Sequence, residues 1–174
     1  MSGADDEGGP LRADELDAFL AQPLMLKLAC VRPDGWPYVI PLWFAWSEQR
    51  LYVVGRERAV WVQYLQQEPR VGVLVDEEAR RHRRVQMTAT ARIVEGPIAR
   101  GAGSPRWRAL DELLVARYMA DEAGQAYKAL TAERPRYLVE LTPVQVTTWR
   151  GGDWHARYAQ PGDQAPPPTS VTVA

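Results

Sequence analysis

Residues 24–55, LMLKLACVRPDGWPYVIPLWFAWSEQRLYVVG, contain three apolar runs separated by two turn sequences. The first turn, RPDG at 32–35, has proline and glycine where a β-turn needs them, and SEQR at 47–50 forms the second. Short runs of β-branched and aromatic residues between such turns are typical of strands. We therefore predict a meander of three strands. Its middle run, 36–46, is apolar on both faces and must be covered on both sides.

Helical and strand patterns follow one another along the rest of the chain. Asp14 can cap a short helix that Pro23 ends. Apolar spacing predicts further helices over 58–67 and over 105–130, the second with a break near Asp121. Further strands are predicted over 70–76, 84–95 and 137–149, the last as one strand or as two divided at Pro143. Because successive strands lack the helical crossovers that parallel pairing needs, we predict a mainly β fold, a small antiparallel β-barrel with added α helices.

The composition limits the class of protein. A length of 174 residues fits one globular domain, and a formal net charge of −1 gives no electrostatic support for nucleic acid or membrane as a partner. The longest apolar runs reach about half of a bilayer span, and the start of the chain is acidic and polar. We therefore expect a cytoplasmic protein with a disordered N-terminus (1–12), one folded domain (13–158) and a proline-rich disordered tail (159–174).

Familiar catalytic motifs are missing from the sequence. It contains no GxGxxG, P-loop, HExxH, CxxC or GxSxG pattern, so Rossmann binding, P-loop hydrolysis and the common zinc and serine chemistries have no support. The single cysteine, Cys30, lies in an apolar run and is interpreted as core filling, and His82 lies in a charged loop. With so few cysteines and histidines, we predict no metal site.

Tryptophans and two arginines are the features that point to a ligand. The chain has seven tryptophans against two phenylalanines, and tryptophan lines cores, interfaces and ring-binding pockets. The predicted strand that ends at Gly55 brings Arg56 and Arg58 to the start of a helix, where helix N-termini and guanidinium groups bind phosphate. Two exposed arginines at a helix start are the simpler alternative.

Five stretches that span most of residues 14–158 follow one another in the order LACVRPDGWPYVIPLWFAW, LYVVG, YLQQEPRVGVLVD, VQMTATARIVEG and LTPVQVTTWRGGDWHARY. In this order they resemble the pyridoxamine 5′-phosphate oxidase-like family, the FMN-binding split barrels that also include deazaflavin (F420)-dependent reductases. The resemblance implies a six-stranded antiparallel split β-barrel, a homodimer, and a flavin in each of two clefts at the dimer interface. It also implies a small-molecule substrate.

The resemblance assigns roles to residues of this sequence one position at a time. Pro41, Leu42 and Trp43 would offer backbone and ring surface to the flavin, and Gly55 would allow its close approach. The implied cofactor-binding residues are Pro41, Leu42, Trp43, Val54, Gly55, Arg56, Arg58, Trp61, Arg84 and Trp149, and the candidates for contact with the substrate are His155 and Arg157.

The helix after the third strand departs from the family at its phosphate site. Family members begin this helix with Ser or Thr, Arg and Lys, whereas positions 59–61 hold Ala, Val and Trp here, so the usual phosphate lysine is Trp61. Either Arg56 and Arg58, with one arginine of the 80–84 cluster, hold the phosphate instead, or the ligand has no phosphate at that place.

The resemblance predicts an FMN-dependent oxidoreductase that transfers a hydride to or from a small organic substrate. The cofactor carries out that chemistry, so no catalytic side chain is assigned. The alternatives are an F420-dependent reductase, a non-enzymatic binder of haem or another flat ligand with His82 and His155 as its imidazole ligands, and a cofactor-free structural dimer. Residues 154–157 differ from the pattern of the vitamin-oxidising enzymes, so oxidation of pyridoxamine phosphate itself is not expected.

Overall fold

A computed structural model describes residues 9–78, 82–119, 121–151 and 170–171, so most of the predicted disordered ends, 1–12 and 159–174, lies outside it. Its helices are α1 (Ala13–Leu20), α2 (Val60–Gln67), α3 (Pro105–Tyr118) and α4 (Asp121–Thr131), with a 3₁₀ turn at Arg100–Ala102. Its strands are β1 (Leu26–Val31), β2 (Pro37–Leu42), β3 (Phe44–Ser47), β4 (Arg50–Arg56), β5 (Arg70–Asp76), β6 (Arg84–Ile98), β7 (Arg136–Trp149) and β8 (Ser170–Val171). In this part of the chain, no helix is long and apolar enough to cross a membrane.

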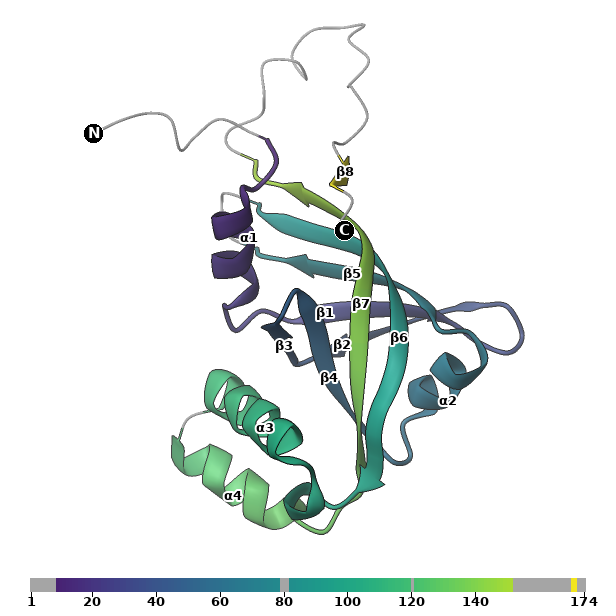
Figure 1. Cartoon of the computed structure of the whole chain (residues 1–174), viewed down its shortest axis with the longest axis vertical. Coiled ribbons are helices and arrows are strands. Elements are labelled where there is room, and N and C mark those ends of the chain that lie inside the picture. Colours follow the sequence, from purple (N-terminus) through teal and green to yellow (C-terminus); the bar gives the residue numbers. More distant parts are fainter. Residues whose placement is uncertain (1–8, 79–81, 120, 152–169, 172–174) are drawn as a thin grey trace, which may run out of the picture.

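The strands form one antiparallel sheet that curls into a split barrel (Figure 1). Its order is β2-β1-β5-β6-β7-β4-β3, with β8 paired to β7. This confirms the predicted mainly β, antiparallel fold. Within the described residues, the run 36–46 divides at Trp43 into β2, which pairs with β1, and β3, which pairs with β4. The main path therefore has one strand more than the six predicted, and Trp43 joins its two ends.

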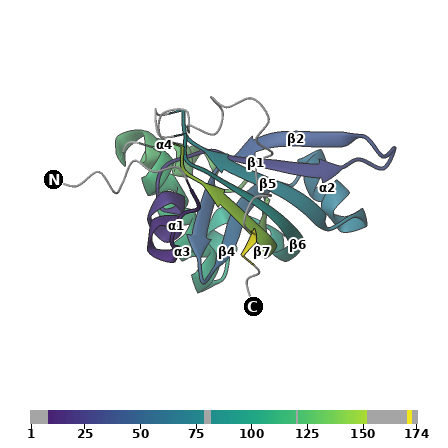
Figure 2. The same ribbon diagram turned by 90° about the horizontal axis from the view of Figure 1, so that it is seen from above.

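Helices cover the two faces of β4 and β7 differently, with α2 on one side and the pair α3 and α4 on the other (Figures 1 and 2). The larger core fills the barrel and includes Phe44 of β3 and Trp61 of α2. A second core joins Tyr52 of β4 to Trp107 of α3. Cys30 belongs to the larger core, where burial raises the pKa of its thiol, in agreement with its interpretation as core filling.

Two residues at the end of α3 attach this helix to the barrel. Arg117 Nη1 donates a hydrogen bond to the carbonyl oxygen of Phe44 at 3.1 Å, and the Tyr118 hydroxyl donates one to the carbonyl oxygen of Leu24 at 2.7 Å. The Tyr118 ring also stacks on Trp43, with ring centroids 5.2 Å apart and planes 2° from parallel. These contacts hold the Trp43 ring at the joint between β2 and β3.

The outer face of the β1–β2 hairpin is exposed. Its predicted turn is present, with Gly35 at a φ of +83°, a conformation that favours glycine. Beyond the turn, Trp36 and Val39 are 69% and 61% exposed. The run 36–46 was expected to be covered on both sides, and the described chain covers only one, because β2 forms an edge of the sheet and its other face is exposed.

Gly55 of β4 faces α2 and has no room for a side chain. A Cβ atom there would lie 2.5 Å from Val62 Cγ2 and 2.9 Å from Trp61 Cζ2. We expect Gly55→Ala to lower the free energy of unfolding by about 1–3 kcal/mol, because an overfilled core must shift its side chains or backbone. Urea titration followed by tryptophan fluorescence measures this change.

Gly72→Ala is the matched control on another strand of the same sheet. Its added Cβ would lie 3.5 Å from the Ala29 Cβ, which is ordinary van der Waals contact. We expect this variant to be as stable as the wild type or slightly more stable, because alanine restricts the unfolded chain. Equal stability of the Gly55 and Gly72 variants would contradict the described packing of α2.

Candidate functional site

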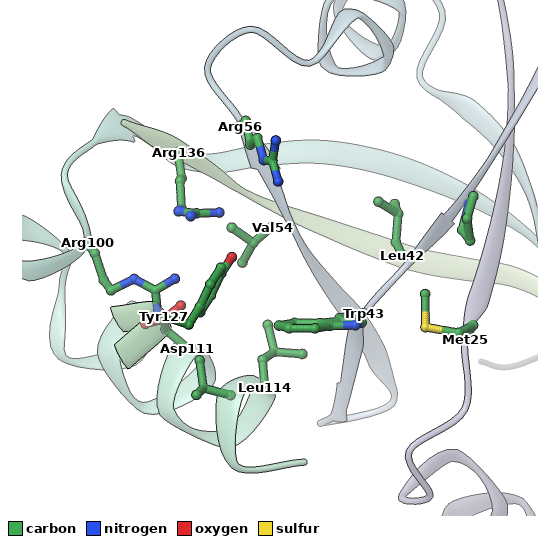
Figure 3. Close-up of a pocket in the computed structure, with 12 residues that line it drawn as sticks. Met25, Leu42, Trp43, Val54, Arg56, Arg100, Asp111, Leu114, Tyr127 and Arg136 are labelled. Atoms are coloured by element: carbon green, nitrogen blue, oxygen red, sulfur yellow. Dashed lines mark hydrogen bonds and ion pairs between the residues drawn. The ribbon is translucent and has the colours of Figure 1, made fainter. Parts of the chain in front are cut away.

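A cavity of about 300 Å³ opens between the ends of β4 and β7 and the helical pair α3 and α4 (Figure 3). Its volume lies at the lower end of the range for small-molecule pockets, roughly 300–1,000 Å³. The residues that line it are Met25, Pro41, Leu42, Trp43, Val54, Arg56, Arg100, Asp111, Leu114, Val115, Tyr127 and Arg136. The cavity thus brings together half of the ten residues that the family resemblance predicts for the cofactor.

Strand β4 divides its residues between this cavity and the core. Neighbouring residues of a strand point to opposite faces, so Val54 and Arg56 line the cavity while Gly55 faces α2. Trp61 lies on that second side with 3% of its surface exposed. Gly55 and Trp61, both predicted to bind the cofactor, therefore do not line this cavity. The position of the family's phosphate lysine holds a buried indole that packs against the glycine.

Aromatic rings form one wall of the cavity. The Trp43 ring, already stacked on Tyr118, meets the Tyr127 ring edge-on, with centroids 5.9 Å apart and planes 63° apart. In Figure 3, Trp43 and Tyr127 border the same open volume, and Leu42 and Leu114 add apolar surface. A wall of this kind accepts a flat ring.

Three arginines and one aspartate supply the charge of the cavity. Asp111 of α3 accepts a hydrogen bond from Arg100 Nη1 at 2.6 Å, and both side chains are buried. Burial raises the pKa of Asp111, and the guanidinium groups of Arg100 and Arg136 oppose that rise. The guanidinium carbons of Arg100 and Arg136 lie 5.0 and 5.6 Å from the Tyr127 ring centroid. Because Arg100 already neutralises Asp111, the cavity carries a net positive charge.

Other residues predicted for the site lie away from the cavity. Arg58 is exposed in the connection between β4 and α2. Arg84 and Trp149 face each other across β6 and β7, with the guanidinium carbon 6.0 Å from the indole centroid, at the end of β7 far from the cavity. The candidates for substrate contact, His155 and Arg157, lie outside the described residues.

The sequence prediction misses seven lining residues of this cavity, four of which carry polar or charged groups: Arg100, Asp111, Tyr127 and Arg136. The first three occupy a glycine-rich connection and two helices, where a polar side chain is ordinarily a surface residue. Arg136 follows a proline at the start of a strand, and its position opposite Arg56 depends on the pairing of β4 with β7. That pairing was the missing signal, because a single sequence does not give the order of the strands.

A family model described as pyridoxamine 5′-phosphate oxidase matches residues 13–150 of the chain. No curated protein matches this chain in sequence.

Several solved structures have a similar fold. The heme storage protein HutZ from Vibrio cholerae is 23% identical with a TM-score of 0.63, over 82% of this chain and 98% of that one. An FAD-binding protein from Mesorhizobium loti is 22% identical with a TM-score of 0.61, over 83% and 96% of the two chains. An F420 reductase is 22% identical with a TM-score of 0.55, over 75% and 94%. At these identities the likeness shows the fold alone.

The buried pair of Arg100 and Asp111 is testable by its effect on stability. We expect Asp111→Ala to lower the free energy of unfolding by about 3–5 kcal/mol, because it leaves a buried guanidinium without its partner. Glu112→Ala is the matched control, since Glu112 is exposed and pairs with Lys128, and pairs of this kind contribute about 0–1 kcal/mol. Chemical denaturation compares the two variants, and an equal loss in both would show that the Asp111 pair is not buried.

Proposed function

The chain belongs to the pyridoxamine 5′-phosphate oxidase-like family, and from this premise we propose that it is an FMN-dependent oxidoreductase acting on a small organic substrate. The proposed site of the cofactor is the cavity beside β4. A flavin bound there would supply the hydride transfer. The protein would bind the flavin, orient it and exclude water from it.

One observation carries this proposal: an aromatic wall lines the same cavity as a cation, Arg56, that forms no ion pair with the described residues. The Trp43 ring and the Leu42 side chain provide flat apolar surface for a ring system. Arg56, at the end of β4, provides a guanidinium group for the phosphate. This combination fits a ligand that is flat at one end and anionic at the other.

The usual phosphate position of the family does not contribute to the proposed site. Trp61 is buried in the core, and Ala59 and Val60 carry no charge. Arg56, the last residue of β4, lines the cavity, whereas Arg58 in the β4–α2 connection does not, although both side chains are exposed. We therefore assign the phosphate to Arg56 rather than to the first turn of α2.

A deazaflavin is the second candidate cofactor, because F420 also joins a flat ring to a phosphate. An F420 reductase is among the proteins with a similar fold. Haem is the third candidate, since the similar HutZ is a heme storage protein. Among the described residues that line the cavity there is no histidine, so haem would have no imidazole ligand from them. This ranks haem below the two flavin-type cofactors.

We also propose that a second copy of the chain covers the exposed face of the β1–β2 hairpin. Val31, Trp36 and Val39 are 40%, 69% and 61% exposed on this hairpin. Apolar side chains gathered at a sheet edge are typical of a protein interface. Pro41 and Leu42 of the same hairpin line the cavity, so a partner seated there would border the ligand and enclose more of it than one chain does.

Titration of FMN and F420 into the full chain, followed by cofactor fluorescence, tests the proposed function. We expect at least one of them to bind at micromolar concentration with quenched fluorescence, because its ring would lie against Trp43. Arg56→Ala should weaken this binding about tenfold or more, the effect of losing one charge-assisted hydrogen bond. Arg70→Ala, which removes an exposed arginine paired with Glu68, should leave it unchanged. If neither cofactor binds, the proposed function is rejected.

Sedimentation velocity tests the proposed dimer. We expect the wild type to sediment as a dimer, and Val39→Asp to sediment as a monomer, because a carboxylate would be buried in the interface without a partner. Leu130→Asp is the control, since Leu130 is 72% exposed on α4 and lies away from the hairpin. A monomeric wild type, or a monomeric Leu130 variant beside a dimeric Val39 variant, would contradict the proposed interface.

A further inference from the structure

Arg136 is a buried cation without an ion-pair partner among the described residues. It is 5% exposed, its Nε atom has no hydrogen-bond partner, and its guanidinium group contacts the Tyr127 ring, with its carbon 5.6 Å from the ring centroid. Burying an unpaired charge is strongly unfavourable. Arg136 is nevertheless held at the wall of an open cavity, where a ligand can reach it.

The residue opposite Arg136 in the sheet carries the same charge. In the pairing of β4 with β7, Arg136 lies directly across from Arg56, an arrangement of like charges that is destabilising. Both residues line the cavity, and Figure 3 shows their guanidinium groups turned toward one volume beside Tyr127. A small anion in that volume would contact both groups and offset their repulsion.

The other buried charges in the described part of the chain have partners. Glu140 accepts hydrogen bonds from Arg92 at 2.8 Å and from the Tyr52 hydroxyl at 2.9 Å. Arg100 is bonded to Asp111, the one acidic residue among those that line the cavity. That hydrogen bond commits Asp111 to Arg100, and the Asp111 carboxylate acts on Arg136 only through a Coulomb interaction and not through an ion pair. An anion bound in the cavity would supply the ion-pair partner that Arg136 lacks among the described residues.

We propose that Arg136 and Arg56 form an anion clamp that binds the carboxylate or phosphate group of a ligand whose ring lies against Trp43. Guanidinium groups form paired hydrogen bonds with such oxyanions. The inference rests on the proposed function for the identity of that ligand, because the anionic group belongs either to the cofactor or to an acidic substrate. In both cases Arg136, which the sequence did not identify, determines the preference for a charged ligand.

Two matched pairs of ligands test the clamp. FMN and riboflavin share a ring system and differ in the phosphate, and benzoate and benzamide share a ring and differ in charge. We expect isothermal titration of the full chain to show about tenfold or greater preference for the anionic member of at least one pair. Arg136→Gln should abolish that preference. Arg134→Gln, which changes an exposed arginine two positions earlier, should retain it.

The outcomes show whether the anion belongs to the cofactor or to an acidic substrate. They also distinguish failure of the clamp from failure of the proposed function. Loss of the FMN preference in Arg136→Gln assigns the clamp to the cofactor phosphate, and loss of the benzoate preference assigns it to an acidic substrate. The clamp is rejected if the wild type shows neither preference or if Arg136→Gln retains them. If no flavin binds but the benzoate preference depends on Arg136, the proposed function fails and the clamp stands. If flavins bind but neither the FMN preference nor the benzoate preference depends on Arg136, the clamp alone fails.

Thermal unfolding distinguishes the clamp from a structural role of Arg136. Because the change removes an unpaired buried charge, we expect Arg136→Gln to unfold at the same temperature as the wild type or higher. Millimolar benzoate or inorganic phosphate should raise the Tm of the wild type but not that of the variant, since a ligand stabilises only the form that binds it. A lower Tm for the variant with undiminished protection by both anions would overturn the inference.

Discussion

Strand β4 presents Gly55 to one face of the sheet and Val54 and Arg56 to the other, and the rest of the site depends on this alternation. On the first face, the missing side chain lets α2 approach until the Trp61 indole would touch any added Cβ. On the second face, the same strand ends in a cation that reaches the cavity. The buried tryptophan and the open cavity are therefore two consequences of one strand whose residues point alternately to opposite sides.

The pairing of β4 with β7 extends this arrangement to distant parts of the chain. It places Arg136 opposite Arg56, and the helical insertion between β6 and β7 brings Asp111 and Tyr127 over the same face. The end of α3 is bonded to the barrel next to Trp43, so the aromatic wall is fixed in place. Among the described residues Arg136 is buried without an ion-pair partner, and unfavourable buried groups of this kind are retained mainly at functional sites.

Local sequence features predicted most of the elements. Turn residues and proline stops predicted the β1–β2 turn, the β3–β4 turn and the helix at α2, because these signals act within a few residues. For residues 137–149 they left one strand or two as alternatives, and the structure has the single strand β7. The division at Trp43 was not predicted, since the chain there changes its pairing partner without any turn residue, in a run that is apolar throughout. The exposed face of β2 was also unexpected, because an apolar pattern shows that a strand needs covering and not which molecule covers it.

The residues that line the candidate cavity were predicted where they are neighbours in sequence and missed where they are not. Pro41, Leu42 and Trp43 follow one another, so a family pattern could identify them together. Arg100, Asp111 and Arg136 meet only through strand pairing and helix placement, and each is an ordinary polar residue in its own segment. Trp61 was predicted to contact the cofactor because the family has its phosphate lysine at this position. In the structure the Trp61 indole lies in the larger core.

The visible absorption spectrum of the freshly purified full chain, recorded before and after incubation with FMN or F420 and removal of the excess, tests the proposed site most directly. We expect the absorption band of a flavin or deazaflavin that stays with the folded protein and passes into the filtrate after unfolding. A protein that remains colourless after both incubations, or one that is purified with the Soret band of haem, would contradict the assignment of this cavity to a flavin-type cofactor.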